Sequence, residues 1–394
     1  MTEGAGLRPR VVIVSRWLPV PPDNGARIRR DQLLGALVDE FEIDYVALLD
    51  DPTATTNANA AVIEAMGVHV HRFRQPAFRP RSPAAVAAWF GPRPRAVVTT
   101  HSRAAADFIG ELCATRRPAV VIADEIHTAH YAIGRARPVL VEEIQLAHLA
   151  EATGLGARLG WVKNRAYHRR ILEQVAAATT PSELERSLAL DIAPRSRVEV
   201  IANGVDIERL RPADVPVDPD LLVYAGSPQY AANLDAIRWF AGSVLGQVRA
   251  VRPRARLVVT GATEGVSLPE APGLEFCGHV DDLAALVRRA ACSVVPLRLG
   301  GGTRIKVLEA LALGTPVVAT AKGVEGLGLE RGVEIDVADD PEGLARAITA
   351  LLDDPRRRAD RSAAGRAAVV VRHSWTPVRD RYRSLVGELA AGGG

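Results

Sequence analysis

The sequence predicts an α/β protein with two doubly wound, Rossmann-like domains that face each other across a cleft. Three observations lead to this fold class. Short runs of branched apolar residues alternate with segments whose apolar residues recur at helical spacing. Glycines follow several of these runs in both halves of the chain. At 394 residues the chain is long enough for two domains of ordinary size.

The N-terminal half opens with a buried strand at residues 11–14, four branched residues in a row. A loop rich in turn formers then leads into a helix at 26–38. Further strands are expected at 43–48, 68–73, 119–123, 138–141, 176–180 and 198–201, and helices at 58–66, 103–113 and 159–175. Residues 74–95 are rich in proline and arginine and are expected to leave this alternation as a mobile excursion.

A proline-containing loop after Asn203 has the composition of a linker, so the domains are predicted at residues 1–203 and 204–375. The second half repeats the alternation. Its strands are expected at 221–224, 256–260, 274–277, 293–297, 317–320 and 333–337, and its helices at 233–251, 281–290, around Glu309, and at 341–352, 356–371 and 377–391.

Composition limits the classes of function. The formal net charge of +3 and the 5% aromatic content do not favour a nucleic-acid partner. Three scattered cysteines, with no C-x-x-C pair, indicate neither a zinc site nor a disulfide framework, and all three are expected to be core residues. No apolar run is long enough to span a bilayer. A cytoplasmic protein is expected, with peripheral contact at the inner face of a membrane left open.

The stretch 296–329 carries the clearest chemical signal. A short strand runs into Gly300, Gly301 and Gly302, and Thr303, Arg304 and Lys306 follow at the start of a helix that carries Glu309. Glycines let a ligand approach the backbone, and a helix N-terminus beside two cations favours an anion. The spacing matches neither the dinucleotide fingerprint nor the Walker loop. A purely structural glycine loop explains this stretch equally well when it is considered alone.

The N-terminal half has a candidate site of its own. Asn24 and Gly25 form a turn between the first strand and its helix, with Arg27 just beyond. Asp124, Glu125 and His127 follow the strand at 119–123. Since open α/β sheets bind ligands at the carboxyl ends of their strands, these residues are site candidates. A packing or surface role is the more common one for a single histidine.

These motifs resemble glycosyltransferase family 4, the retaining enzymes of the GT-B fold, over nearly the whole chain. The resemblance rests on residues 22–25, 202–206, 224–227 with Asn233, 277–280, and above all on residues 301–318. The last stretch looks like the branch that acts in exopolysaccharide, cell-envelope and natural-product glycosylation. In that fold the final helix, here 376–394, crosses back to complete the N-terminal domain.

The resemblance implies metal-independent transfer of a sugar from a nucleotide-diphosphate sugar to a glycan, lipid-linked or natural-product acceptor. It requires no cofactor, and the oligomeric state stays open. The donor would contact the C-terminal domain and the acceptor the N-terminal domain, past Gly25, with His127 helping to position acceptor or sugar. The resemblance places the base near Gly278, His279 and Val280, the ribose at Glu309 and the diphosphate at Gly302 and Thr303. Gly226, Ser227 and Gly301 are further donor-binding candidates.

Two departures from the family pattern matter. Family members carry two glutamates separated by seven residues, and the first of these falls on Gly301. They also place Arg and Lys after the first strand of the C-terminal domain, where this chain has Ser227 and a neutral run. We expect Arg304 and Lys306 to supply the missing charge. A nucleotide-sugar epimerase of the same fold, or a nucleotide-binding partner subunit without turnover of its own, remains as an alternative.

Overall fold

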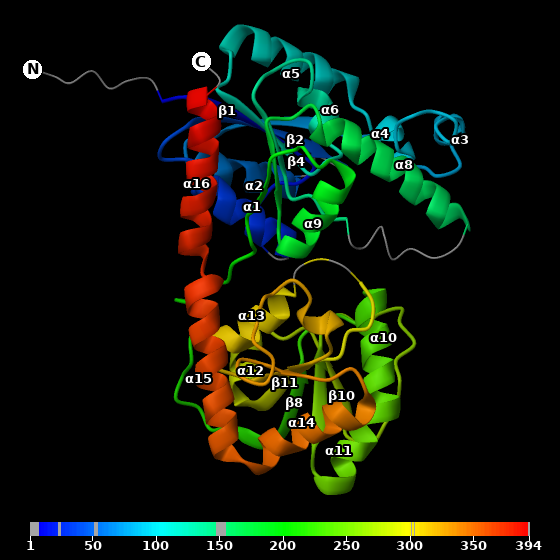
Figure 1. Cartoon of the computed structure of the whole chain (residues 1–394), viewed down its shortest axis with the longest axis vertical. Coiled ribbons are helices and arrows are strands. Elements are labelled where there is room, and N and C mark those ends of the chain that lie inside the picture. The colour runs from blue at the N-terminus through cyan, green and yellow to red at the C-terminus, as the bar shows by residue number, and fades with distance from the viewer. Residues whose placement is uncertain are drawn as a thin grey trace, which may run out of the picture. The chain divides into compact units, whose positions relative to one another are not determined.

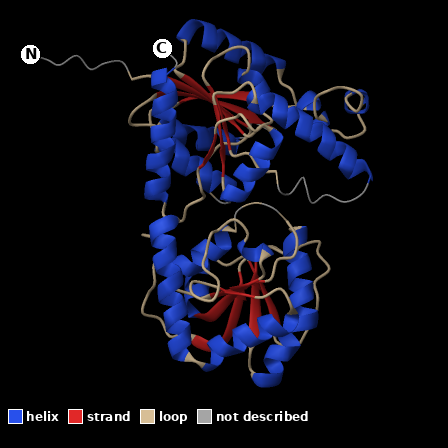
Figure 2. Ribbon diagram, viewed as in Figure 1, coloured by secondary structure: helices blue, strands red, loops and turns tan. Residues whose placement is uncertain are grey.

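A computed structural model describes residues 8–22, 25–50, 54–146, 155–300, 302 and 304–392. The chain forms two compact units, Met1–Ala202 with Val378–Gly394 and Asn203–Pro377. The sequence placed these boundaries at 203/204 and 375/376. Each unit has a central sheet with helices around it (Figure 2).

Unit 1 is built on a parallel seven-stranded sheet in the order β3-β2-β1-β4-β5-β6-β7 (Figure 1). Its strands are β1 Arg10–Ser15, β2 Glu42–Leu49, β3 His69–Arg74, β4 Val120–Asp124, β5 Val139–Glu142, β6 Ala177–Thr180 and β7 Val198–Val200. Its helices are α1 Gly25–Gly35, α2 Ala54–Glu64, α3 Pro83–Ala87, α4 Arg95–Thr99, α5 Arg103–Arg116, α6 Ala129–Ala132, α8 Leu155–Leu172 and α9 Glu183–Ile192. The last helix, α16 Trp375–Gly392, joins this unit from Val378 onward. Arg383 on α16 donates from Nε to the carbonyl of Ala36, 2.9 Å away.

Unit 2 is built on a parallel six-stranded sheet in the order β10-β9-β8-β11-β12-β13. Its strands are β8 Asp218–Tyr224, β9 Arg256–Thr260, β10 Leu274–Gly278, β11 Ala290–Val295, β12 Val317–Ala319 and β13 Asp336–Val337. Its helical segments are α10 Ala231–Trp239, η1 Phe240–Val244, α11 Leu245–Val251, α12 Leu283–Arg289, α13 Ile305–Ala312, η2 Lys322–Val324, α14 Pro341–Asp353 and α15 Pro355–Arg372. These two parallel sheets with Rossmann-like strand order confirm the predicted fold class.

The strand orders place one switch point in each sheet, where consecutive connections leave to opposite sides. It lies between β1 and β4 in unit 1 and between β8 and β11 in unit 2. Loops that follow these strands diverge there, and a ligand can enter between them. Predicted site residues of both halves follow these strands, whereas Gly278, His279 and Val280 lie at the end of the edge strand β10.

Several local predictions need correction. Residues 74–95, expected as a mobile excursion, contain the short helix α3 and the first residue of α4. The helix α9 was not predicted, although Ser182 caps it by accepting from the backbone N–H of Glu185. The expected helix at 233–251 contains a π-helical segment, η1. Cys277 is exposed rather than part of the core, because β10 is the edge strand of its sheet.

Candidate functional site

The carboxyl edge of the unit 2 sheet forms a continuous rim of glycine-containing loops. Gly261, after β9, donates its N–H to the carbonyl of Gly278, the last residue of β10, at 2.7 Å. Gly261 has a φ of +100°, and a Cβ on it would lie 2.5 Å from the Cα of Ser227, after β8. The backbone is therefore close-packed along three neighbouring strand ends. Gly261 is not among the site residues predicted from the sequence.

Lys306 reaches from α13 across the switch point to the end of β8. Its Nζ lies 3.2 Å from Tyr224 Oη and 3.1 Å from Asn233 Oδ1, over the Tyr224 ring. A Cβ on Gly226 would lie 2.4 Å from this Nζ, so glycine leaves room for the ammonium. Lys306 forms no ion pair with a carboxylate in the described part of the chain. Burial and the nearby Arg304 lower the pKa of Lys306 to about 7, although Glu309 opposes the shift.

Arg304 braces the loop that precedes α13. Its side chain is buried, and it donates from Nη2 to the carbonyl of Gly300 at 2.7 Å and from Nε to that of Lys322 at 3.2 Å. The guanidinium thus ties the glycine loop after β11 to the turn after β12. Gly302 takes a left-handed φ of +82°. Gly301 and Thr303, both predicted to contact the donor, lie outside the described residues.

Glu309 lies one turn beyond Lys306 on α13 and is half-buried. Burial raises the pKa of its carboxyl, opposed by the positive charges of Arg209 and Lys306. No hydrogen bond to this carboxylate is formed within the described residues. A partly desolvated acceptor without donors can bind hydroxyl groups of a ligand.

The predicted base-binding residues lie on the edge strand of the same sheet. Gly278 has a φ of +66°, and His279 directly after it is 87% exposed in its side chain. The only carboxylate near the His279 ring is that of Asp281, 3.8 Å from Nε2, among the residues described. Gly278 is joined to the rim through Gly261, whereas the His279 side chain extends into solvent.

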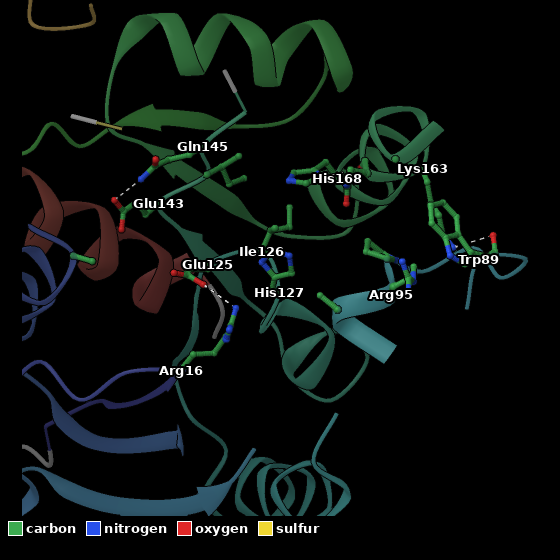
Figure 3. A pocket seen from close by; sticks show the side chains of 16 residues that line it. Arg16, Trp89, Arg95, Glu125, Ile126, His127, Glu143, Gln145, Lys163 and His168 are labelled. Carbon is green, nitrogen blue, oxygen red and sulfur yellow. Dashed lines mark hydrogen bonds and ion pairs between the residues drawn. The ribbon is translucent and has the colours of Figure 1, made fainter. Parts of the chain in front are cut away.

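Unit 1 contains a cavity of about 490 Å³ at the carboxyl ends of β4 and β5. Figure 3 shows charged and polar side chains pointing into it from the strand ends, α8 and the α3–α4 region. The labelled lining residues are Arg16, Trp89, Arg95, Glu125, Ile126, His127, Glu143, Gln145, Lys163 and His168. This volume is sufficient for a small ligand or one end of a larger one.

The structure separates the predicted acceptor residues. Glu125 and His127 line the cavity. Asp124 does not: it is 4% exposed and accepts hydrogen bonds from Ser15 and Arg30 beneath the cavity floor. Gly25 opens α1 and Arg27 lies in its first turn, but neither lines the cavity, and Asn24 lies outside the described residues.

Glu125 and Glu143 occupy equivalent places on neighbouring strands. Each follows the last residue of its strand, with φ of +68° for Glu125 and +56° for Glu143. Non-glycine residues rarely adopt this conformation, and such strain concentrates at functional sites. Glu125 accepts from Arg30 Nη2 at 3.0 Å, and Glu143 accepts from Gln145 Nε2 at 2.7 Å. The repeated pattern of two acids after a buried strand, at 124–125 and 142–143, could have identified Glu143 from the sequence.

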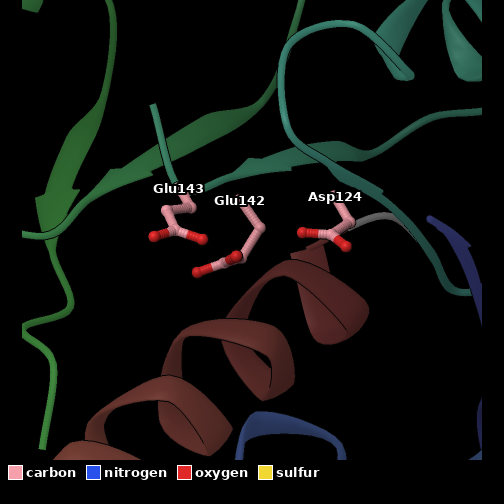
Figure 4. Close-up of side chains that lie close together, drawn as sticks. All are labelled: Asp124, Glu142 and Glu143. Atoms are coloured by element: carbon pink, nitrogen blue, oxygen red, sulfur yellow. The ribbon is translucent and has the colours of Figure 1, made fainter. Parts of the chain in front are cut away.

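An ion-pair network lies beneath these two glutamates. Asp124, Glu142 and Glu143 bring one carboxylate oxygen each within 4.8 Å of one another (Figure 4). Arg29, which is fully buried, donates to Glu142 Oε1 from Nε at 2.9 Å and from Nη2 at 2.7 Å. Burial raises the pKa of Glu142 to about 7 against the opposing charge of Arg29.

This network does not suit a metal ion. The guanidinium of Arg30 pairs with Asp124, and that of Arg29 pairs with Glu142. A divalent cation among these carboxylates would lie beside two buried positive charges. The arginines therefore take the place of a metal, and the network holds α1 against the strand ends that carry Glu125 and Glu143.

Residues 219–354 match the family described as "Glycosyl transferases group 1". A glycogen synthase of Mycobacterium tuberculosis (strain ATCC 25618 / H37Rv) is 29% identical over 290 residues, covering 66% of this chain and 67% of the relative. A D-inositol 3-phosphate glycosyltransferase of Frankia alni is 31% identical over 218 residues, covering 48% of this chain and 54% of the relative. The chain thus spans about half the length of the second relative.

Solved structures share the fold over nearly the whole chain. Sucrose-phosphate synthase from Thermosynechococcus elongatus has a TM-score of 0.70 at 18% identity, covering 98% of this chain and 100% of that one. Anabaena HepE in complex with UDP has a TM-score of 0.69 at 12% identity, covering 96% and 100%. These structures show the shared fold, whereas the family match over residues 219–354 and the sequence relatives identify the chain as a glycosyltransferase.

Proposed function

We propose that the chain transfers a sugar, with retention of configuration, from a nucleotide-diphosphate sugar in unit 2 to an acceptor hydroxyl in unit 1. One observation carries the proposal: the half-buried Lys306 ammonium has two neutral hydrogen-bond partners, Tyr224 and Asn233, at the switch point of the unit 2 sheet. A buried cation without a counter-ion is costly, and a bound anion removes that cost. Structures of Anabaena HepE with UDP and with UDP-glucose support a nucleotide sugar as the donor.

The rim of the unit 2 sheet offers a group for each part of such a donor. Lys306, for whose ammonium Gly226 leaves room at the end of β8, and the N–H groups of the first turn of α13 face the diphosphate. Ser227 lies beside that approach. Glu309 accepts hydrogen bonds from the two ribose hydroxyls, and the base lies toward residues 278–280. Arg304 also holds the loop that carries these groups.

Under this proposal, positive charge in the site of unit 2 assists departure of the diphosphate from the sugar. As the bond to the sugar breaks, negative charge grows on the leaving diphosphate, and preorganised cations and N–H groups stabilise it. Lys306 gains a full charge when the anion binds, because the anion raises its pKa. The protein's own cations thus supply what a divalent metal supplies at other diphosphate sites, so we propose a metal-independent reaction.

The cavity of unit 1 is proposed to hold the acceptor. Glu125, Glu143 and His127 present polar groups that can orient a sugar or polyol hydroxyl there. A glycan, a lipid-linked glycan or a natural product fits this chemistry, in line with the exopolysaccharide and natural-product branch. The exposed free thiol of Cys277 is compatible with the reducing cytoplasm, where we place the protein.

A ligand screen tests the donor assignment. Isothermal titration and thermal shift with the purified chain should show saturable binding of at least one nucleoside diphosphate and its sugar conjugate. A ligand at 100 times its dissociation constant stabilises the folded state by about 2.7 kcal/mol. Incubation of the donor with candidate acceptors should then yield a glycosylated product. Absence of binding by every nucleoside diphosphate would overturn the proposal, and epimerised donor in place of transfer would assign a different reaction.

The Glu309 assignment has its own test. Glu309→Gln should weaken binding of the ribonucleoside diphosphate by about tenfold, since charge-assisted hydrogen bonds are stronger than neutral ones. The 2′,3′-dideoxy analogue should bind the variant and the unmodified protein equally. Equal weakening for both ligands would show that Glu309 acts on the fold of the site and not on the ribose.

A further inference from the structure

Exposed apolar side chains gather on unit 1 around α3, α4 and the middle of α8. Their exposed fractions range from 41% for Val98 to 92% for Phe90. The set consists of Phe78, Val86, Trp89, Phe90, Val98 and Val162. Clusters of this kind on a soluble protein mark interaction sites more often than chance.

Two cations join these segments into one surface. The Arg95 guanidinium lies 4.8 Å from the Trp89 ring centre and 5.9 Å from that of Phe78, and its Nε donates to the carbonyl of Ala85 at 2.9 Å. Lys163 on α8 donates to the carbonyl of Ala88 and lies 3.4 Å from that of Trp89. Figure 1 shows α3 and α4 beside α8. We call these segments the α3–α8 surface.

The α3–α8 surface carries positive charge without acids. Residues 74–103 contain six arginines and no Asp or Glu. The helix α8 contains four arginines and one lysine, again without an acid. Arg79, Arg81, Arg93 and Arg165 are exposed, and none of them forms an ion pair within the described residues.

We propose that the α3–α8 surface binds the surface of an anionic phospholipid membrane. Aromatic and aliphatic side chains such as Phe90 and Val86 would enter the interfacial layer, and the arginines would pair with lipid phosphates. A nucleic acid fits less well. The exposed valines offer nothing to bases or phosphates, and the Arg95 guanidinium lies against the Phe78 and Trp89 rings that would have to stack.

The acceptor cavity shares its wall with this surface. Trp89, Arg95 and Lys163 all line the cavity. Membrane binding would therefore hold one wall of the cavity at the lipid headgroups, where a lipid-linked acceptor presents its sugar. This last consequence rests on the proposed function, whereas membrane binding itself does not.

Vesicle flotation of the full chain without nucleotide tests the proposal. The protein should float with vesicles of phosphatidylcholine mixed with phosphatidylglycerol, but not with phosphatidylcholine alone, and binding should weaken as salt rises. Each basic side chain near an anionic surface contributes about fivefold to binding. Arg79→Glu with Arg81→Glu should thus weaken partitioning at least about tenfold. Phe90→Ser with Val86→Ser should weaken it similarly by removing interfacial contacts.

A matched control carries the same types of change elsewhere. Arg356→Glu with Val371→Ser alters an exposed cation and an exposed valine of α15 in unit 2 and should leave flotation unchanged. Circular dichroism and thermal melting should show all variants folded. Equal flotation with neutral vesicles, or no flotation, would overturn the proposal. So would a dimer that Phe90→Ser with Val86→Ser converts to monomer, or a preference for RNA over vesicles. Nucleotide binding should also be measured on the same variants. This measurement distinguishes failure of the donor proposal from failure of the membrane proposal.

Discussion

Lys306 on α13 places a positive charge at the end of β8, a different part of the chain. After β8 the chain has Ser227 and a neutral run where the resembling family has cations. Because Gly226 lacks a side chain, the Lys306 ammonium reaches that position from α13. The sequence predicts that Lys306, together with Arg304, supplies charge from the glycine loop. The structure adds that its half-buried ammonium lies against the neighbouring strand end and is hydrogen-bonded to the neutral side chains of Tyr224 and Asn233.

Replacing Lys306 should change protein stability and ligand affinity in opposite directions. Lys306→Met should weaken nucleoside-diphosphate binding by about 1.5–3 kcal/mol, the value of a hydrogen bond to a charged group. It should also stabilise the unliganded protein by about 1–2 kcal/mol, because a buried, uncompensated charge is removed. Titration calorimetry and urea unfolding measure the two effects. Lys163→Met, which removes a lysine from unit 1, should leave nucleotide affinity unchanged. Loss of both stability and affinity in Lys306→Met would contradict this role.

The pKa of Lys306, lowered to about 7, predicts a pH dependence of donor binding. The anion favours the protonated form, so binding raises this pKa. The contribution of Lys306 to the affinity for the nucleotide sugar should be constant below about pH 7 and should fall as pH rises above this value. Above about pH 7, binding should be accompanied by proton uptake. A nucleotide sugar is the right ligand, since its diphosphate has no terminal phosphate to titrate. Calorimetry in buffers of different ionisation enthalpy measures the uptake, which Lys306→Met should abolish.

Folding stability should respond to pH in the opposite direction. The folded-state pKa of Lys306 lies below its ordinary value of 10.5, so the unfolded chain binds more protons between about pH 7 and that value. The contribution of Lys306 to the stability of the unliganded protein should therefore rise as pH increases from about 7 to 10.5. The difference between the unmodified protein and Lys306→Met isolates the contribution.

At the scale of elements, the site of unit 2 depends on how closely the loops after β8, β9 and β10 pack. Gly261 is the central contact, since it bonds to Gly278 and leaves no room for a Cβ beside Ser227. In unit 1, ion pairs between α1 and the strand ends hold the site in place. Arg29 and Arg30 of α1 fix the ends of β5 and β4, which carry Glu143 and Glu125. The two sheets share a topology but hold their sites by different forces.

Gly261→Ala should disturb the rim of the unit 2 sheet. The new methyl group would meet the Ser227 backbone at 2.5 Å, and φ of +100° is unfavourable for alanine. We expect a loss of stability of about 1–3 kcal/mol and weaker nucleotide binding. Gly265→Ala is the matched control, because Gly265 also has a positive φ, +74°, but no atom within 4 Å of a new Cβ. Thermal melting and nucleotide titration of both variants check the difference. Equal binding by both would mean that the contact with Ser227 does not shape the site.

At the scale of the whole molecule, the chain consists of two units with separate cores. The described core cluster of unit 2 draws only on residues 205–369, and the two described clusters of unit 1 draw on residues 12–198. No helix in the described part of the chain is long and apolar enough to cross a bilayer. Each unit buries its own sheet, and the polypeptide passes between them near residues 202 and 378.

Separate cores predict two unfolding transitions. Calorimetry of the full chain should resolve them, and a bound nucleoside diphosphate should raise the midpoint of one transition by mass action. Lys306→Met should reduce that shift and leave the other transition in place. A single transition that moves as a whole with nucleotide would show instead that the two units unfold cooperatively.

The sequence by itself determined the fold class, since buried parallel strands and amphipathic helices have distinct periods along the chain. It also determined which loops follow the central strands, and hence the candidates Gly226, Lys306, Glu125 and His127. Local signals were sufficient here because glycines, strand ends and helix starts are features of neighbouring residues.

Only the tertiary structure decided what each candidate contacts. It turned Asp124 into the buried partner of Arg30, gave Arg304 the role of a brace, and brought Glu143, Gln145 and Lys163 to one cavity. It also gathered the exposed side chains of the α3–α8 surface from two distant segments. These outcomes depend on which strands are neighbours and on which side chains compete for one buried space. Contacts between residues far apart in the chain leave no periodic signal in the sequence.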